Sequence, residues 1–97
     1  MLGVPLTFEY YSLAAGASAN FTVNQPRYLL VWLCESSGRG AMKLSFVLST
    51  GETTLGTTSS TLTEKFALSL DRTNNLLKLT NNDSVSIGGK IVVLGNY

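Results

Sequence analysis

The chain has 97 residues, of which 44% are hydrophobic and only 13% are charged, and its formal net charge is +1. This length supports one domain, residues 1–97, that is large enough to bury a hydrophobic core of its own. The low and balanced charge excludes nucleic acid and anionic membranes as expected partners, and no apolar run approaches the length of about 20 residues that spans a membrane.

The N-terminal part of the chain predicts two strands joined by a turn of small residues. Residues 6–10 alternate between apolar and polar side chains, which is typical of a half-buried strand. Tyr11 and Leu13 continue the apolar pattern one position out of phase, so we expect a β-bulge beside Tyr10. Residues 20–24 alternate again and predict the second strand.

The run over residues 27–35 is the most apolar part of the chain and holds its only tryptophan, Trp32, and its only cysteine, Cys34. Side chains of a strand point alternately to opposite faces, so a run that is apolar at odd and even positions needs cover on both faces. We expect the domain's own core to cover one of them, and the pattern leaves open which one. A single cysteine excludes an internal disulfide, and we expect Cys34 to be a buried, inert thiol.

The next part of the chain predicts a hairpin followed by a long polar stretch. Residues 36–40 hold two glycines and predict a loop, after which the apolar residues Leu44, Phe46 and Leu48 recur at every second position of a half-buried strand. Residues 49–63 are rich in Thr and Ser. We expect a long loop there, with a short edge strand in its middle.

The C-terminal third of the chain predicts three more strands. Residues 65–70 and 76–80 each alternate between apolar and polar side chains, and the turn between them is rich in Asn. A second turn follows at residues 81–84. The last strand includes residues 91–94, which are apolar on both faces like the run over residues 27–35.

The spacing of these elements predicts the fold class. No stretch shows the i, i+3, i+4 apolar periodicity of an amphipathic helix, and the sequence has no internal repeat. About seven or eight short strands, with a turn signal about every ten residues, are typical of an antiparallel β-sandwich. We therefore expect a single all-β sandwich with jelly-roll or Greek-key topology.

The sequence offers little catalytic chemistry. It has no histidine, which removes the commonest general base and metal ligand and every nucleophile pair that depends on one. No pattern brings two carboxylates together, so we expect these groups to be solvated and the protein to be no enzyme, without cofactor or metal site. The carboxylates are Glu9, Glu35, Glu52, Glu64, Asp71 and Asp83.

Pairing of the two runs that are apolar on both faces predicts an interaction surface. If residues 27–35 lie beside residues 91–94, their outward faces form one apolar patch, which on a soluble domain usually marks an interface. We expect a homo-oligomer, with a trimer favoured over a dimer. The alternative is that a loop or the N-terminal segment covers the patch. The expected interface residues are Tyr28, Leu30, Trp32, Val92 and Leu94.

Loops and aromatic side chains predict where a ligand would bind. An exposed Tyr or Trp stacks on the apolar face of a sugar while a nearby polar side chain binds its hydroxyl groups. Packing is nevertheless the favoured role of Trp32, because it lies within a strand pattern. The expected contact regions are the segments 36–40 and 49–61. The candidate ligand contacts are Tyr11, Arg39 and Asn82.

Four segments carry a resemblance to known proteins, namely residues 15–23, 28–31, 76–81 and 91–95. Together they resemble the small β-sandwich domains of bacteriophage virion proteins, especially tail-fibre tips and head fibres. The likeness lies in the general pattern of residues over most of the chain. It contains no binding motif from which the role of a particular residue could be inferred. Such domains are commonly trimeric, non-enzymatic and used for attachment to a host surface, often to its polysaccharide.

The expected function follows from this resemblance. It implies a non-enzymatic virion structural or host-attachment protein, with other virion proteins or host polysaccharide as further partners. The N-terminus lacks the basic region and the apolar core of a signal peptide, so we expect synthesis in the host cytoplasm and a final place in the virion. The alternative is a stand-alone carbohydrate-binding, lectin-like module.

Overall fold

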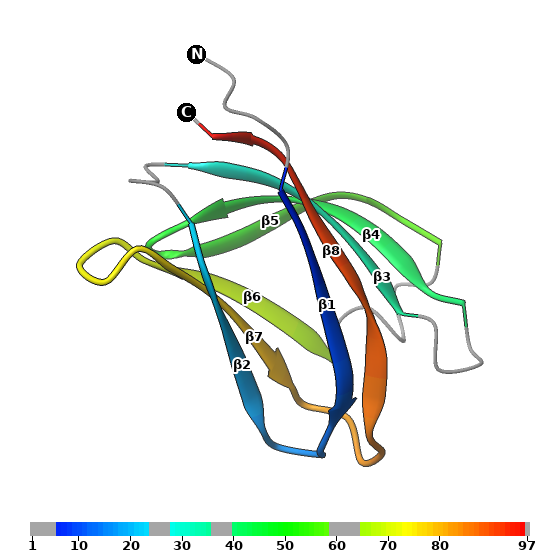
Figure 1. Cartoon of the computed structure of the whole chain (residues 1–97). Coiled ribbons are helices and arrows are strands. Elements are labelled where there is room, and N and C mark those ends of the chain that lie inside the picture. The colour runs from blue at the N-terminus through cyan, green and yellow to red at the C-terminus, as the bar shows by residue number, and fades with distance from the viewer. Residues whose placement is uncertain (1–5, 24–27, 36–39, 59–64, 97) are drawn as a thin grey trace.

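The structure is an all-β sandwich, as the sequence predicts. The computed structural model of the chain describes residues 6–23, 28–35, 40–58 and 65–96, apart from the side chains of Tyr11 and Asn96. These residues form eight strands and no helix, arranged as two antiparallel sheets (Figure 1). The strands are β1 (Leu6–Leu13), β2 (Ser18–Thr22), β3 (Leu29–Glu35), β4 (Met42–Leu48), β5 (Gly51–Thr57), β6 (Phe66–Asp71), β7 (Leu76–Asn81) and β8 (Ile87–Asn96).

The two sheets differ in size and are connected by crossovers. The large sheet has the strand order β1-β8-β3-β4-β5, and the small sheet has the order β2-β7-β6. β3, β4 and β5 follow one another in the large sheet, and the chain then passes through β6 and β7 before β8 returns to lie beside β3. The order β8-β3-β4-β5 is that of a Greek key, one of the two expected topologies.

β3 lies in the middle of the large sheet, and its side chains are buried at every second position. Leu29, Val31 and Leu33 are all 0% exposed and belong to the core between the sheets. Fully burying an aliphatic side chain of this size stabilises the fold by about 1.5–3 kcal/mol. The buried apolar side chains of the small sheet are Phe66, Leu68, Leu70, Leu77 and Leu79.

β3 pairs with β8 on one side and with β4 on the other. Trp32 lies opposite Val92 in β8 and opposite Leu44 in β4. The predicted pairing of the two runs that are apolar on both faces is therefore confirmed, and so is the hairpin of β3 and β4. The even-numbered residues of β3 point away from the core, which decides the question that the sequence pattern leaves open.

β4 and β5 differ from their sequence-based descriptions. The buried positions of β4 are Lys43, Ser45 and Val47, so its recurring apolar residues face away from the core. The reversal follows from the register, because Leu44 lies opposite Trp32 on the outward side of β3. β5 takes up most of the described part of the expected long loop, so the edge strand is longer than predicted.

The predicted bulge in β1 is confirmed. Tyr10 lies opposite Gly89 and Leu13 lies opposite Ile87, so two residues of β1 face a single residue of β8. Ser12, within the bulge, has a φ of 51°. Bulges of this kind bend the strand and re-aim its side chains.

The side chain of Tyr10 ties β1 to β3 across β8. It passes over Gly89, and its hydroxyl donates a hydrogen bond of 3.0 Å to the carbonyl oxygen of Cys34. Only glycine fits at position 89, because a Cβ there would lie 1.8 Å from the same carbonyl oxygen. Burial, followed by electrostatic repulsion from Glu35 and Cys34, raises the pKa of Tyr10 above its ordinary value.

A buried ion pair joins the two sheets through β4, β5 and β6. The ammonium group of Lys43 lies 2.9 Å from Oε1 of Glu52 and also donates to the carbonyl oxygen of Phe66. The same Glu52 oxygen accepts a hydrogen bond of 3.0 Å from the backbone N–H of Leu68. Side chains of the large sheet therefore satisfy two backbone groups of β6, which would otherwise be costly to bury.

The expectation that the carboxylates are solvated is wrong for three of them. Glu35 and Asp83 are 0% and 6% exposed, and the side chain of Glu52 is 16% exposed. Two of them have a lysine partner outside their own element: Glu52 pairs with Lys43, and the ammonium group of Lys65 lies 3.6 Å from Asp83. A pattern of alternation along one strand does not reveal partners on another strand. Glu64 lies outside the described residues.

Replacing Tyr10→Phe keeps the ring and removes the hydroxyl group. We expect the free energy of unfolding to fall by about 1 kcal/mol near neutral pH, the usual net contribution of one hydrogen bond. In the unfolded chain the Tyr10 hydroxyl group ionises at about pH 10. In the folded state it keeps its proton above this pH, because its pKa is raised. The contribution of the hydroxyl is therefore present below this pH and is lost above it. Urea unfolding of both proteins across this range measures the difference, and an advantage of the wild type that persists unchanged well above pH 10 would contradict the account.

Replacing Lys43→Met leaves Glu52 in its buried position without its counter-ion. We expect a loss of about 3 kcal/mol in the free energy of unfolding, because breaking a buried pair costs more than removing both charges. The double variant Lys43→Met, Glu52→Gln keeps an acceptor for Leu68 and is expected to be more stable than the single variant. Thermal and urea unfolding of the wild type and the two variants measures these differences. A double variant that is less stable than Lys43→Met would contradict the expectation.

Candidate functional site

We call the face of the large sheet that points away from the small sheet the outer face. Trp32 and Tyr28 are each 42% exposed on it. Cys34, which was expected to be buried, is half-buried at the same face. The remaining half-buried side chains of the outer face are Leu30, Met42, Leu44, Phe46, Leu48, Val92 and Leu94.

The central row of the outer face crosses all five strands of the large sheet. The cross-strand register aligns Thr7, Val92, Trp32, Leu44 and Gly56, one residue from each strand. Residues directly opposite each other in an antiparallel pair have Cβ atoms about 5 Å apart, so their side chains are neighbours on the same face. The central row therefore has a tryptophan in its middle and an aliphatic side chain on either side.

A second row lies beside the central row, toward Tyr28. Leu30 is opposite Phe46 of β4, and on its other side a register shift leaves Leu94 as an extra residue of β8. The rings of Tyr28 and Phe46 are tilted by 31° with their centroids 5.7 Å apart, a separation at which aromatic rings attract. All five residues expected at the interface thus lie on one apolar face.

The sequence pattern misses the part of this face that β4 contributes. Leu44 and Phe46 recur at every second position, which is also the pattern of a strand whose apolar side faces the core. The signal that identifies them is the hairpin, because its register fixes which residues share a face. Once β3 pairs with β4, Leu44 lies on the same side of the sheet as Trp32.

Charge is confined to one end of the outer face, as far as its side chains are described. Glu9 of β1 and Lys90 of β8 lie opposite each other, with the ammonium nitrogen 3.8 Å from Oε1. Both side chains are exposed, and an exposed pair of this kind contributes little to stability. The centre of the face therefore offers apolar contact rather than charge.

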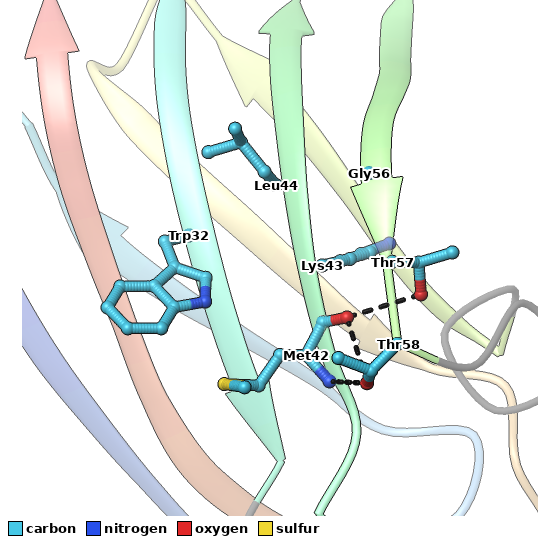
Figure 2. A pocket seen from close by; sticks show the side chains of 7 residues that line it. All are labelled: Trp32, Met42, Lys43, Leu44, Gly56, Thr57 and Thr58. Atoms are coloured by element: carbon cyan, nitrogen blue, oxygen red, sulfur yellow. Dashed lines mark hydrogen bonds between the residues drawn. The ribbon is translucent and has the colours of Figure 1, made fainter.

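A shallow, open hollow of about 300 Å³ lies beside Trp32 (Figure 2). At Gly56 no atom lies within 4 Å of the place that a Cβ would take. Oγ1 of Thr58 accepts a hydrogen bond of 2.9 Å from the N–H of Met42, and Oγ1 of Thr57 donates one of 3.2 Å to the Met42 carbonyl. Two hydroxyl groups therefore border an otherwise mainly apolar hollow. Its lining residues are Trp32, Met42, Lys43, Leu44, Gly56, Thr57 and Thr58.

Of the three candidate ligand residues, only Asn82 has a side chain that the structure describes. Asn82 is exposed in the turn between β7 and β8. Its neighbour Asn81 is buried, and the side-chain amide of Asn81 donates a hydrogen bond of 2.9 Å to the carbonyl oxygen of Leu13. Arg39 and the side chain of Tyr11 lie outside the described residues.

A metal site and a membrane-spanning helix are two further features that the described ranges of the chain can reveal. No group of three or more Cys, Asp or Glu side chains within them is placed to hold a metal ion. Within the same ranges no helix has the length and apolar character needed to cross a bilayer. The buried carboxylates Glu35, Glu52 and Asp83 belong to three separate sets of contacts.

No protein-family model, curated protein or solved structure matches this chain. Among the described residues, the outer face is an apolar surface that the small sheet does not cover.

Replacing Trp32→Ala tests whether this side chain belongs to the outer face or to the hydrophobic core. Because the Trp32 side chain is partly exposed in the single chain, we expect the variant to lose roughly 1 kcal/mol in the free energy of unfolding. The matched variant Leu33→Ala, one residue along the strand and fully buried, is expected to lose about 2–5 kcal/mol. Urea unfolding at high dilution measures both values. A loss for Trp32→Ala as large as that for Leu33→Ala would place the indole ring in the core.

Proposed function

We propose that this chain is a non-enzymatic structural or host-attachment protein of a virion, and that it works as a homo-oligomer through its outer face. The observation that carries the self-association is the apolar centre of this face, where Trp32 and Tyr28 are each 42% exposed. A contiguous apolar surface on a soluble domain usually marks a site of interaction.

The energetic argument concerns side chains that the core does not need. β3 is anchored by its fully buried residues on the inner side, so the outward residues Leu30 and Trp32, which are only partly buried, add less to the stability of the single chain than the inner residues do. Covering them with a partner removes apolar surface from water, and each Å² so removed contributes about 25 cal/mol. Aromatic residues at the centre of such a patch commonly dominate the binding energy.

The virion setting is supported by the resemblance of the chain to small β-sandwich domains of bacteriophage virion proteins. That resemblance favours three subunits and attachment to a host surface. It also supports other virion proteins or host polysaccharide as further partners. Sedimentation equilibrium, which tests the self-association, also gives the number of subunits.

A second candidate function is that of a carbohydrate-binding module. The observation that favours it is the position of Trp32 beside the open hollow, with the hydroxyl groups of Thr57 and Thr58 at its border. An exposed indole ring offers the apolar platform on which a pyranose ring stacks. In this case the protein binds glycans as a monomer.

Replacing Leu30→Lys tests the proposed self-association. We expect the wild type to be oligomeric in sedimentation equilibrium at high micromolar concentrations and the variant to be a folded monomer, because the new charge lies at the centre of the contact. The matched control is Asn20→Lys, which adds the same charge at an exposed position of β2 and should leave the oligomer intact.

Two outcomes count against the proposed self-association. A wild type that stays monomeric at every concentration contradicts it, and an unfolded Leu30→Lys variant, by circular dichroism, places this side chain in the core instead. A glycan array with the wild type and with Leu30→Lys addresses the second candidate function. Glycan binding by a monomeric wild type favours the carbohydrate-binding module.

A further inference from the structure

We propose that the outer face binds the outer face of a second copy of this chain across a two-fold axis that runs along β3, with the two Trp32 side chains meeting at the axis. This inference rests on the self-association proposed above and adds its symmetry. It requires neither the virion setting nor a sugar ligand.

The chemistry of the central row is symmetric about β3. Trp32 lies between Val92 and Leu44, two aliphatic side chains, and the row ends in Thr7 on one side and Gly56 on the other. Rotation about an axis along β3 exchanges the two halves of the row. Val92 of one copy then faces Leu44 of the other, and the two uncharged ends also face each other.

The second row keeps the same symmetry. Leu30 lies on β3 and therefore near the axis, with Phe46 on the β4 side and Leu94 on the β8 side. After rotation Phe46 of one copy faces Leu94 of the other, and the two Leu30 side chains meet. A patch that matches itself in this way is what an isologous, two-fold contact requires.

The position of the charged residues decides the direction of the axis. Lys90 and Leu94 lie on β8, on either side of Val92 and on the same face. An axis across the strands would place Lys90 of one copy over Leu94 of the other and would bury the charge of Lys90, together with that of its exposed partner Glu9, against apolar surface. The cost of removing both charges from water can exceed the attraction between them. An axis along β3 places Lys90 over Met42 instead, where the long side chain reaches solvent at the end of the sheet.

The partner that suits this face best is the chain itself. Because the described charges of the face, Glu9 and Lys90, are confined to one end and pair with each other, a highly charged partner finds little to complement it. A trimer requires each copy to present two different surfaces, whereas one self-complementary face closes with two copies. The inference therefore departs from the trimer that the resemblance implies.

The size of the face indicates a dimer of low affinity. The five strands lie about 4.8 Å apart, and each contributes about six residues with a rise of about 3.3 Å per residue. The flat area of the outer face is therefore roughly 20 by 20 Å, without the additional surface of the projecting side chains. A standard interface buries about 800 Å² per partner. The area of the outer face is about half of this value, so we expect a reversible dimer that forms at high micromolar concentrations and dissociates on dilution.

Sedimentation equilibrium of the wild-type chain is the first test. A concentration-dependent equilibrium between monomer and dimer supports the inference. A monomer at all concentrations overturns both the inference and the proposed self-association. A trimer leaves the proposed self-association standing and overturns only the two-fold contact.

Cross-linking then tests the axis. Cys34 lies on β3, so the native thiols of the two copies face each other near the axis across sheets about 10 Å apart. A short bismaleimide is expected to convert the wild-type dimer into a covalent dimer. A wild-type dimer that is not cross-linked at Cys34 overturns the inference without any substitution.

Two variants in a Cys34→Ser background distinguish the directions of the axis. Val92→Cys and Leu44→Cys, mixed in equal amounts, are expected to give several-fold more covalent dimer than either variant alone. Efficient cross-linking of Val92→Cys to itself would place the axis across the strands and overturn the inference. Circular dichroism establishes that each variant is folded before it is used.

Discussion

β3 carries apolar side chains that point to both faces and lies in the middle of the large sheet, so contact with water is unfavourable on either face. The small sheet covers the inner face, where Leu29, Val31 and Leu33 are fully buried. In the single chain the outward side chains, among them Trp32, remain in part exposed. This partly exposed apolar surface is the reason why the outer face is the candidate functional site of this domain.

Polar side chains hold the sandwich together at two places away from its apolar centre. At one side the hydroxyl of Tyr10 reaches over Gly89 and ties β1 to β3. At the other side Lys43 and Glu52 bind backbone groups of β6 and join the large sheet to the small one. Because these contacts lie inward, the outer face is left with little charge.

Much of the fold follows from the sequence, and the reasons for success and failure are physical. Alternation and turn residues predict the strands, and the two-sided runs predict that β3 pairs with β8, because each needs cover on the same two faces. The inward position of Lys43 was not predictable from the alternation along β4, since this side chain binds Glu52 of β5 and a backbone carbonyl group of β6. For the candidate site, Trp32 was predictable, whereas the contribution of Leu44 depends on the register of the hairpin.

The measurement that tests the account most directly is the fluorescence of Trp32, the only tryptophan in the chain, as a function of protein concentration. If a second copy covers the outer face, the indole ring passes from a partly hydrated to a buried environment as the oligomer forms. We predict that its emission shifts to shorter wavelength from nanomolar to high micromolar concentration, along the same curve as the change in mass. An emission spectrum that stays constant while the protein associates would show that the contact lies elsewhere and would contradict the account.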